Sequence, residues 1–523
     1  MRRQWYIGFG VVLLGILLFL VMLHDTIWFL AVLTPIVILW IYDTTQKEHT
    51  ILRNFPVLGH SRYLLEFFRP EIQQYFIADN EAERPFNREA RSLIYQRAKN
   101  VRDTVPFGTE REITQVGYTW VLHSLAPKHV SEVEPRIIVG GPDCKKPYSA
   151  SRLNISAMSY GSLSPNAIMA LNKGAQLGSF AHNTGEGGLS PYHLQGGDII
   201  FQLGTAYFGC RDDQGRFSED EFKIEANREQ VKMIEIKLSQ GAKPSHGGIL
   251  PAAKLTPEIA RVRKVKMGED VLSPPAHTAF NSPIGLLEFV KKLRDLSGGK
   301  PVGFKLCLGR KEEFLSICKA MLTTNILPDF ITVDGAEGGT GAAPLEYTNR
   351  VGEPLEAALV FVHNALVGIN VRDKIRVICS GKVYSGYDLV AKIAMGADMC
   401  NAARAMMMAI GCIQSKQCNA NTCPTGVATQ NERLQRGLVV DVKKQRVVNY
   451  HRNTMKSFLE MVGAMGLSNP SDLKPDFLMR RVSEESVKSF CEIYDYLKPG
   501  QLLGSDIPPS YKKYWDLATA EKF

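Results

Sequence analysis

The sequence lacks a disulfide-rich character, a strong excess of one charge and internal repeats. Ten cysteines in 523 residues are far too few for a disulfide scaffold. Lys and Arg (62) exceed Asp and Glu (53) by only nine, so the charge balance does not indicate a nucleic-acid partner. Hydrophobic residues at 45% and charged residues at 22% are ordinary globular values, which excludes a disordered or fibrous chain.

The dinucleotide-binding pattern G-x-G-x-x-G is also missing, so a Rossmann-type dinucleotide domain is not indicated. Glycine itself is abundant, with 44 residues, and it suggests loops in which the backbone lies close to a nucleotide or a flavin. At ~100–200 residues per domain, the chain is too long for one small module. It has room for one large barrel and accessory segments.

Formal charge is almost absent near the N-terminus, where Asp25 is the only charged residue between Trp5 and Tyr42. Residues 7–23 and 26–42 are apolar runs, each near the short end of the ~20 residues that span a bilayer. Basic residues flank both outer ends, which is typical of ends that stay in the cytoplasm. We therefore expect residues 1–43 to form a two-helix transmembrane hairpin in contact with membrane lipid, with the catalytic domain in the cytoplasm.

Two alternatives remain for this region. A single span or signal anchor would use one of the runs, and a cleaved signal peptide would use Arg2 and Arg3 as its basic start, although no A-x-A cleavage site follows. If the hairpin is correct, the cysteines stay reduced and are available to a metal. Residues 44–148 then form a basic linker, whose stretch 83–103 is either a solvated helix or a contact with anionic lipid.

From Leu153 onward, short apolar strands alternate with helical patterns, which favours a parallel sheet. About seven such units in ~280 residues indicate an α/β fold, a closed (β/α)8 barrel of the TIM type at 149–470, followed by a C-terminal tail at 471–523. Ser164 followed by Pro165 predicts the start of a helix. The expected strands are 153–159, 180–184, 233–238, 302–308, 330–334, 375–379 and 399–403.

Glycine and polar residues collect directly after several of these strands. In a barrel such loops share one face, where active sites lie. Glycine there lets main-chain amides approach a phosphate or a flavin ring. The segments are 159–161, 184–188, 334–341 and 380–381.

Three of the ten cysteines, Cys412, Cys418 and Cys423, fall within twelve residues, and Pro424 follows the last of them. The surrounding Asn, Thr, Pro and Gly predict a loop, and a proline after the last cysteine is typical of ferredoxin-type cluster loops. The spacing fits neither common zinc pattern. Three ligands indicate a cluster that lacks one iron, and the alternative is three structural cysteines.

These segments together resemble the flavin-binding synthase domain of glutamate synthases over residues 150–470. The resemblance is carried by ISAMSYGSLSP (155–165), NTGEGG (183–188), QGAKPSHGG (240–248), SPPAH (273–277), DGAEGGTGAAP (334–344) and CIQSKQCNANTCPTGVATQ (412–430). The apolar N-terminus with RPFNRE and LIYQRAK resembles the stand-alone, membrane-anchored branch. The resemblance implies FMN, a [3Fe-4S] cluster and an oxidoreductase that makes L-glutamate by reducing the 2-imino acid formed from 2-oxoglutarate and ammonia.

The resemblance also implies roles for individual residues. Lys305 would stabilise the N1/O2 edge of reduced flavin, while Lys243 and Arg263 would bind the two carboxylates of a dicarboxylic 2-oxo acid. The cluster ligands would be Cys412, Cys418 and Cys423. The implied catalytic residues are Glu186, Lys243 and Arg263, and the implied FMN contacts are Ala157, Met158, Ser159, Asn183, Gln202, Lys305, Gly339, Gly341, Gly381, Ala403 and Arg404.

The sequence departs from the family pattern at one point of the substrate region. Where family members usually read Gly-Glu-Gly-Gly-Gln, residues 245–249 read Ser-His-Gly-Gly-Ile, so His246 and Ile249 replace an acid and an amide. A synthase for a related amino acid and a membrane-tethered electron-transfer subunit therefore stay open, as does an inosine-phosphate-dehydrogenase-like barrel with Cys400 as nucleophile. The expected partners are an electron donor (ferredoxin or a reductase subunit) and a separate subunit that supplies ammonia.

Overall fold

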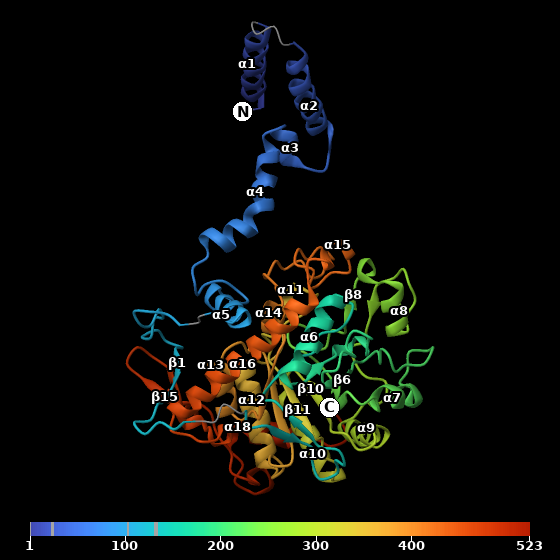
Figure 1. The fold of residues 1–523 in the computed structure, drawn as a ribbon, viewed down its shortest axis with the longest axis vertical. Coiled ribbons are helices and arrows are strands. Elements are labelled where there is room, and N and C mark those ends of the chain that lie inside the picture. The colour runs from blue at the N-terminus through green and yellow to red at the C-terminus, as the bar shows by residue number, and fades with distance from the viewer. Residues whose placement is uncertain (1, 22–25, 102–103, 130–133) are drawn as a thin grey trace. The chain divides into compact units, whose positions relative to one another are not determined.

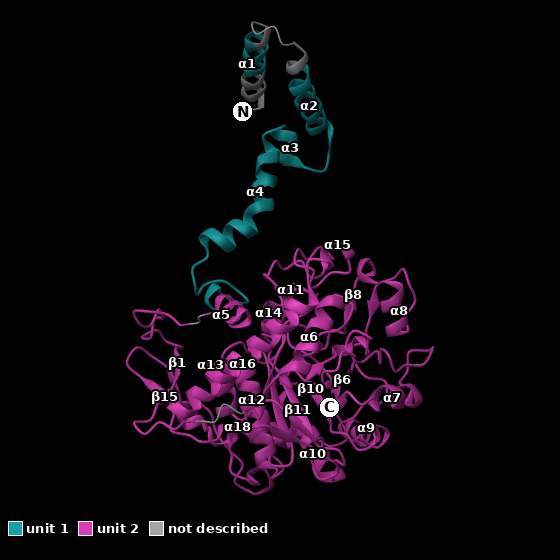
Figure 2. Ribbon diagram, viewed as in Figure 1, with its two compact units in different colours: residues 1–89 teal, residues 90–523 magenta. Residues whose placement is uncertain are grey.

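The computed structural model describes residues 2–21, 26–101, 104–129 and 134–523. The chain divides into two compact units, residues 1–89 and 90–523 (Figure 2). Each unit is built around its own contacts, and the second contains all of the strands that the structure describes and every predicted site residue.

The first unit is helical. Its elements are α1 (Arg2–Val21), α2 (Thr26–Thr45), α3 (Thr50–Asn54), α4 (Gly59–Ile72) and a π-helical turn, η1 (Gln73–Ile77). At the end of α2 the buried Asp43 carboxylate accepts a hydrogen bond from the Val57 amide (2.8 Å) and contacts His60 Nε2 (2.9 Å). This carboxylate fixes the end of α2 against the turn that leads into α4.

Among the residues that the structure describes, no helix is long and apolar enough to cross a membrane. The predicted transmembrane hairpin at 1–43 is therefore not supported, although α1 and α2 do form there. The physical reason lies in the helix sequences, because α1 begins with Arg2 and Arg3 and each apolar run is shorter than the ~20 residues of a typical span. Part of the first run and the link between the runs, residues 22–25, lie outside the described residues.

The second unit is a closed barrel of eight parallel strands, which confirms the predicted fold class (Figure 1). Consecutive strands pair in order around the barrel, and the last strand pairs with the first through Asn401 and Asn154. The strands are β4 (Leu153–Ile155), β5 (His182–Asn183), β6 (Ile199–Leu203), β7 (Val231–Lys237), β10 (Val302–Leu306), β11 (Phe330–Asp334), β12 (Arg376–Ser380) and β13 (Met399–Ala402).

Helices follow most strands and cover the barrel (Figure 1). The predicted start at Ser164 is confirmed, because its side chain accepts a hydrogen bond from the Ala167 amide and Pro165 occupies the first helical position. The longest helix, α16, packs along α6 and α13. The barrel helices are α6 (Pro165–Gly178), α7 (Glu219–Ala226), α9 (Pro283–Leu296), α10 (Lys311–Thr324), α12 (Leu355–Gly368), α13 (Gly386–Ala394), α14 (Arg404–Ala409) and α16 (Val440–Ala464).

Smaller elements complete this unit. Strands β1 (Thr119–Val121), β14 (Leu478–Arg481) and β15 (Val487–Ser489) form an antiparallel sheet that joins residues before the barrel to residues after it. Two ribbons pair β2 (Ile137–Val139) with β3 (Tyr148–Ala150) and β8 (Ile249–Leu250) with β9 (Val271–Leu272). The remaining helices are α5 (Arg88–Lys99), α8 (Pro257–Arg263), α11 (Leu345–Arg350), α15 (Glu432–Gln435), α17 (Phe490–Ile493) and α18 (Pro509–Leu517), and the short turns are η2 (Gly185–Gly187), η3 (Ala252–Lys254), η4 (Pro470–Asp472), η5 (Pro475–Phe477) and η6 (Gln501–Leu503).

Candidate active site

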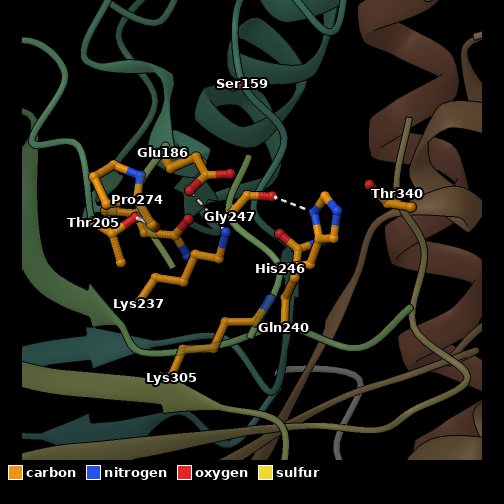
Figure 3. A network of polar contacts seen from close by, with 12 residues as sticks. Ser159, Glu186, Thr205, Lys237, Gln240, His246, Gly247, Pro274, Lys305 and Thr340 are labelled. Carbon is orange, nitrogen blue, oxygen red and sulfur yellow. Dashed lines mark hydrogen bonds and ion pairs between the residues drawn. The ribbon is translucent and has the colours of Figure 1, made fainter. Parts of the chain in front are cut away.

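The carboxyl ends of the barrel strands bring many of the predicted residues to one mouth. Glu186, Lys237 and Lys305 project into the same region, with His246 and Gly247 beside them (Figure 3). Glu186 lies in turn η2, directly after β5, and the two lysines lie on β7 and β10. Lys237 and Lys305 are register partners on neighbouring strands, so their side chains enter the barrel at the same level.

Glu186 and Lys237 form a short ion pair, with 2.7 Å between Oε2 and Nζ (Figure 3). Burial opposes ionisation of this carboxyl, but the charges of Lys237 and Lys243 outweigh burial and lower the pKa of Glu186 to about 2. Glu186 is therefore a carboxylate at neutral pH. It accepts hydrogen bonds and has no proton of its own to donate.

Lys243 and Arg263 are two more buried cations near this carboxylate, 6% and 4% exposed. Burial lowers the pKa of Lys243 to about 8, against the opposing charge of Glu186, and lowers that of Arg263 to about 10. Arg263 donates to the Tyr160 carbonyl (3.0 Å), but its Nε is buried without a hydrogen-bond partner. A buried donor of this kind is costly unless a ligand satisfies it, and the natural ligand is an anion.

Lys305 is held by Asp334, with 3.2 Å between Nζ and Oδ2. Burial favours the neutral amine, but the charges of Asp334 and Glu235 outweigh it and raise the pKa of Lys305. Glu235, 1% exposed, also accepts hydrogen bonds from Asn183 Nδ2 (2.7 Å), Gln202 Nε2 (2.6 Å) and a strand β11 hydroxyl. One carboxylate thus orients two of the predicted flavin-contact amides.

The predicted glycine-rich loops close this mouth. Gly185 has φ +64°, and a Cβ there would lie 2.8 Å from the Ser159 amide nitrogen, so the turn that carries Glu186 packs directly on the loop after β4. A Cβ at Gly339 would lie 2.9 Å from Arg404 Nε, whereas the space around Gly341 is open. Arg404 donates to the Glu337 carbonyl (2.7 Å) and so fixes the loop after β11.

The other predicted contacts lie at the same strand ends. Ala157, Met158 and Ser159 follow β4, Gly381 follows β12, and Ala403 follows β13. These backbone segments, the orientated amides and the Lys305 ammonium fit the polar edges and phosphate of an FMN. The assignment of individual FMN contacts to these residues stays a prediction.

Two residues of this site were not predicted. Lys237 and Glu235 are two positions apart on β7, and both point into the barrel with Lys305. Alternation along a strand places such residues on the same face. The available signal was the spacing of two between Glu235 and Lys237 at the end of the strand VKMIEIK, which places both charges on one face.

The departing segment 245–249 lies beside Glu186. A Cβ at Gly248 would be 2.6 Å from Glu186 Oε1, which leaves no room for a larger residue there. His246 makes an edge contact with Tyr347, with ring centroids 5.0 Å apart. Ile249 begins strand β8 and pairs with Leu272. His246 and Ile249, which stand where the family usually has an acid and an amide, therefore lie in a segment that packs against the Glu186 carboxylate.

The three cysteines of the 412–423 loop are close enough for neighbouring thiols to raise the pKa of Cys412 and of Cys418. Burial and the neighbouring thiols raise the pKa of Cys412 to about 12, whereas hydrogen bonds from Thr425 and nearby amides outweigh burial and lower that of Cys423. In the described part of the chain, no three His, Cys, Asp or Glu side chains are grouped to hold one metal ion. A three-iron cluster does not require three ligands around one metal ion, because each thiolate binds a different iron. A loop with three thiols and nearby amide donors fits such a cluster.

Cys400 would be the nucleophile of an inosine-phosphate-dehydrogenase-like barrel, but it is unsuited to that role. It is fully buried on β13, and its Sγ lies 3.4 Å from Cys379 Sγ. The Cys379 hydrogen bond and burial raise its pKa well above the usual value. An inert thiol of this kind does not attack a substrate.

A closed parallel barrel whose mouth gathers buried lysines, an arginine and carboxylates defines an α/β-barrel enzyme. The protein-family model described as the conserved region in glutamate synthase matches residues 122–468 of this chain. The chain therefore belongs to the glutamate synthase family. The predicted oxidoreductase class, acting on CH-NH2 donors, is thereby confirmed.

The chain is similar to curated members of this family. The glutamate synthase large subunit-like protein YerD of Bacillus subtilis (strain 168) is 38% identical over 498 residues, which cover 87% of this chain and 94% of YerD. The archaeal glutamate synthase (NADPH) of Methanocaldococcus jannaschii is 33% identical over 323 residues, 61% of this chain and 60% of that protein. The match to YerD over almost its full length places the chain with the stand-alone synthase-type proteins, as the sequence predicted.

Proposed function

We propose that the protein reduces a 2-imino acid, formed from a dicarboxylic 2-oxo acid and ammonia, to the corresponding amino acid, with 2-oxoglutarate and L-glutamate as the first candidates. The observation that carries this proposal is the pair of buried cations, Lys243 and Arg263, next to the Glu186 carboxylate. Two cations match the two carboxylates of the acid. A carboxylate beside them matches the N–H groups of the imine.

FMN supplies hydride-transfer chemistry when bound, and the chain's residues prepare the site for it. Lys305 stays protonated and places a positive charge where negative charge develops on a reduced flavin. Asn183 and Gln202 both donate to Glu235, and the Asn183 amide oxygen accepts a hydrogen bond from the Gly185 amide (2.9 Å), so the orientation of both side chains is fixed. Cys412, Cys418 and Cys423 would hold a [3Fe-4S] cluster that passes electrons from a donor such as ferredoxin or a reductase subunit.

The substrate residues divide the remaining work. Arg263 and Lys243 bind the two carboxylates of the substrate. A neutral substrate is excluded because it would leave these two buried cations without counter-charges. Glu186 accepts hydrogen bonds from the nitrogen, and Lys237 keeps Glu186 ionised. Imine formation releases one water, and reduction adds two electrons and two protons. The ammonia comes from solution or from a separate subunit.

The test is an anaerobic half-reaction. Acid-released cofactor is expected to be FMN, and photoreduced protein is expected to reoxidise when 2-oxoglutarate and ammonia are added together, with L-glutamate formed in equal amount. Neither compound alone should reoxidise the flavin. Recovery of FAD would reject the FMN assignment. A flavin that stays reduced would favour the alternative of an electron-transfer subunit without amino-acid chemistry of its own, which the departure at Ile249 also favours.

Binding of the 2-oxo acid is expected to weaken as pH rises above about 8, approaching tenfold per pH unit, because Lys243 loses its proton in that range. Its pKa is lowered from the usual value, so the charge is present below pH 8 and lost above it. Arg263, with a pKa of about 10, stays charged in that range. The pH dependence is measured as the dissociation constant of the 2-oxo acid, read from the flavin spectrum in the absence of ammonia. Lys243→Arg should move the decline to higher pH, and an unchanged profile in that variant would contradict the assignment to Lys243.

Ile249→Gln is expected to tighten 2-oxoglutarate binding about tenfold, because it restores an amide where the family has one and each good hydrogen bond contributes ~1 kcal/mol or more. Titration of the flavin spectrum measures the effect. Leu272→Gln, on the strand paired with Ile249, serves as a polar control in the same ribbon. If neither wild type nor Ile249→Gln responds at millimolar concentration, 2-oxoglutarate is not the substrate, and the electron-transfer function replaces the glutamate synthase reaction as the proposal.

A further inference from the structure

Lys254, in turn η3, is a buried cation that none of the substrate or flavin assignments uses. It is 3% exposed, and its Nζ donates to the carbonyls of Cys418 (3.1 Å), Ser162 (2.8 Å) and Ala428 (3.3 Å). All three ammonium donors are therefore satisfied. None of the three acceptors is a carboxylate, however, so these contacts supply no negative charge.

The three carbonyls belong to different parts of the fold. Ser162 ends the loop after β4 that carries the predicted flavin contacts, Cys418 is the central cysteine of the 412–423 loop, and Ala428 lies on the segment that returns from it. A second contact joins the same pieces, because Asn421 Nδ2 donates to the Ala253 carbonyl (3.1 Å). Turn η3 thus attaches the cysteine loop to the flavin loop.

A buried charge without a counter-charge costs several kcal/mol. The molecule retains Lys254 next to a loop of three thiols, which become thiolates when they bind iron. A [3Fe-4S] cluster with three thiolates is negatively charged and would supply the missing counter-charge. Hydrogen bonds and charges around a cluster set its reduction potential.

We propose that Lys254 is a positioning residue that holds the cysteine loop and, through its positive charge, raises the reduction potential of the cluster. This inference rests on the proposed function, since it requires the cluster to be present. The positive charge favours the reduced cluster, which carries one more negative charge. A higher potential favours transfer of an electron from the donor to the cluster, and Lys254 also holds the loop after β4 through the Ser162 carbonyl.

The chain offers a matched control in Lys300. It is similarly buried, 8% exposed, and its Nζ donates to the carbonyls of Ala226 (2.6 Å) and Arg228 (3.0 Å). It precedes β10, at the opposite end of the strand from the mouth. Removal of Lys300 therefore has the same structural cost without an effect on the cluster.

The experiment is a redox titration of the full chain, followed by the electron paramagnetic resonance of the three-iron cluster, with iron content measured in parallel. At the wild-type midpoint potential, Lys254→Met is expected to lower the ratio of reduced to oxidised cluster about tenfold, a shift of 59 mV for one electron. Lys254→Arg should retain most of the potential, and Lys300→Met should match wild type. If Lys254→Met loses iron, Lys254→Gln, which keeps hydrogen-bond donors without the charge, takes its place.

An unchanged midpoint in a Lys254 variant that retains its iron would overturn the inference and leave the proposed function standing. An equal shift in Lys300→Met would overturn it too, because the effect would then come from general destabilisation. A wild-type protein that carries flavin but no three-iron signal would overturn the cluster assignment itself, together with the inference.

Discussion

Replacement of Lys243 by methionine is expected to lower kcat/KM for the 2-oxo acid by about 100-fold or more while FMN stays bound. A hydrogen bond to a charged group contributes ~1.5–3 kcal/mol, which corresponds to roughly 10- to 150-fold in binding. The upper part of that range applies here, because Lys243 is 6% exposed and water cannot replace it. Its loss also removes one of the charges that keep Glu186 ionised.

The measurements are steady-state kinetics, flavin content and thermal unfolding of the same preparations. Lys243→Arg should recover part of the activity, since it restores the charge with a different geometry. Lys300→Met, with a similarly buried lysine far from the mouth, should keep wild-type KM even if its melting temperature falls. A Lys243→Met enzyme with normal KM and kcat would show that the carboxylates bind elsewhere.

The barrel was predictable because its strands are short apolar runs separated by helical patterns. Seven of the eight strands were expected near their observed positions, and the missing one is β6 (Ile199–Leu203). All five of its residues are buried, including Gln202, so polar and apolar side chains do not alternate in exposure, and a run this short cannot be distinguished from a packed loop by periodicity. The barrel closes only when β6 fills the gap between β5 and β7.

Site residues on recognisable motifs were easier to predict than their partners. Glu186, Lys243 and Arg263 stand in or near motifs, whereas Lys237 carries no motif and matters because it lies 2.7 Å from Glu186. Lys254 is a stronger example, because its three acceptors lie 92, 164 and 174 residues away in the sequence. Tertiary contacts over such separations leave no local pattern.

The N-terminal helices show a prediction that the structure supports only in part. Low charge over residues 5–42 indicated two spans, and helices do form there. Helix formation, however, requires only local propensity, whereas a span also requires about 20 consecutive apolar residues. In the described residues the first condition is met by α1 and α2, and no helix is long and apolar enough to meet the second.

The second large effect is expected from Cys418→Ser, which should reduce bound iron to about a tenth of the wild-type amount or less. A serine hydroxyl does not replace a thiolate as a soft ligand, and a cluster held by three protein ligands loses one third of its attachment. Lys254 continues to hold the Cys418 main chain, so the loop itself is not expected to unfold. Iron, acid-labile sulfide and the electron paramagnetic resonance signal measure the loss.

The control for this substitution is Cys491→Ser. Cys491 is half-buried like Cys418, but its thiol donates to Asp476 Oδ1 (2.6 Å) at the far end of the chain, a bond that serine can reproduce. It should therefore retain full iron and flavin. Equal iron loss from both variants would indicate general unfolding. Stable zinc without iron in the wild-type protein would reject the iron–sulfur cluster.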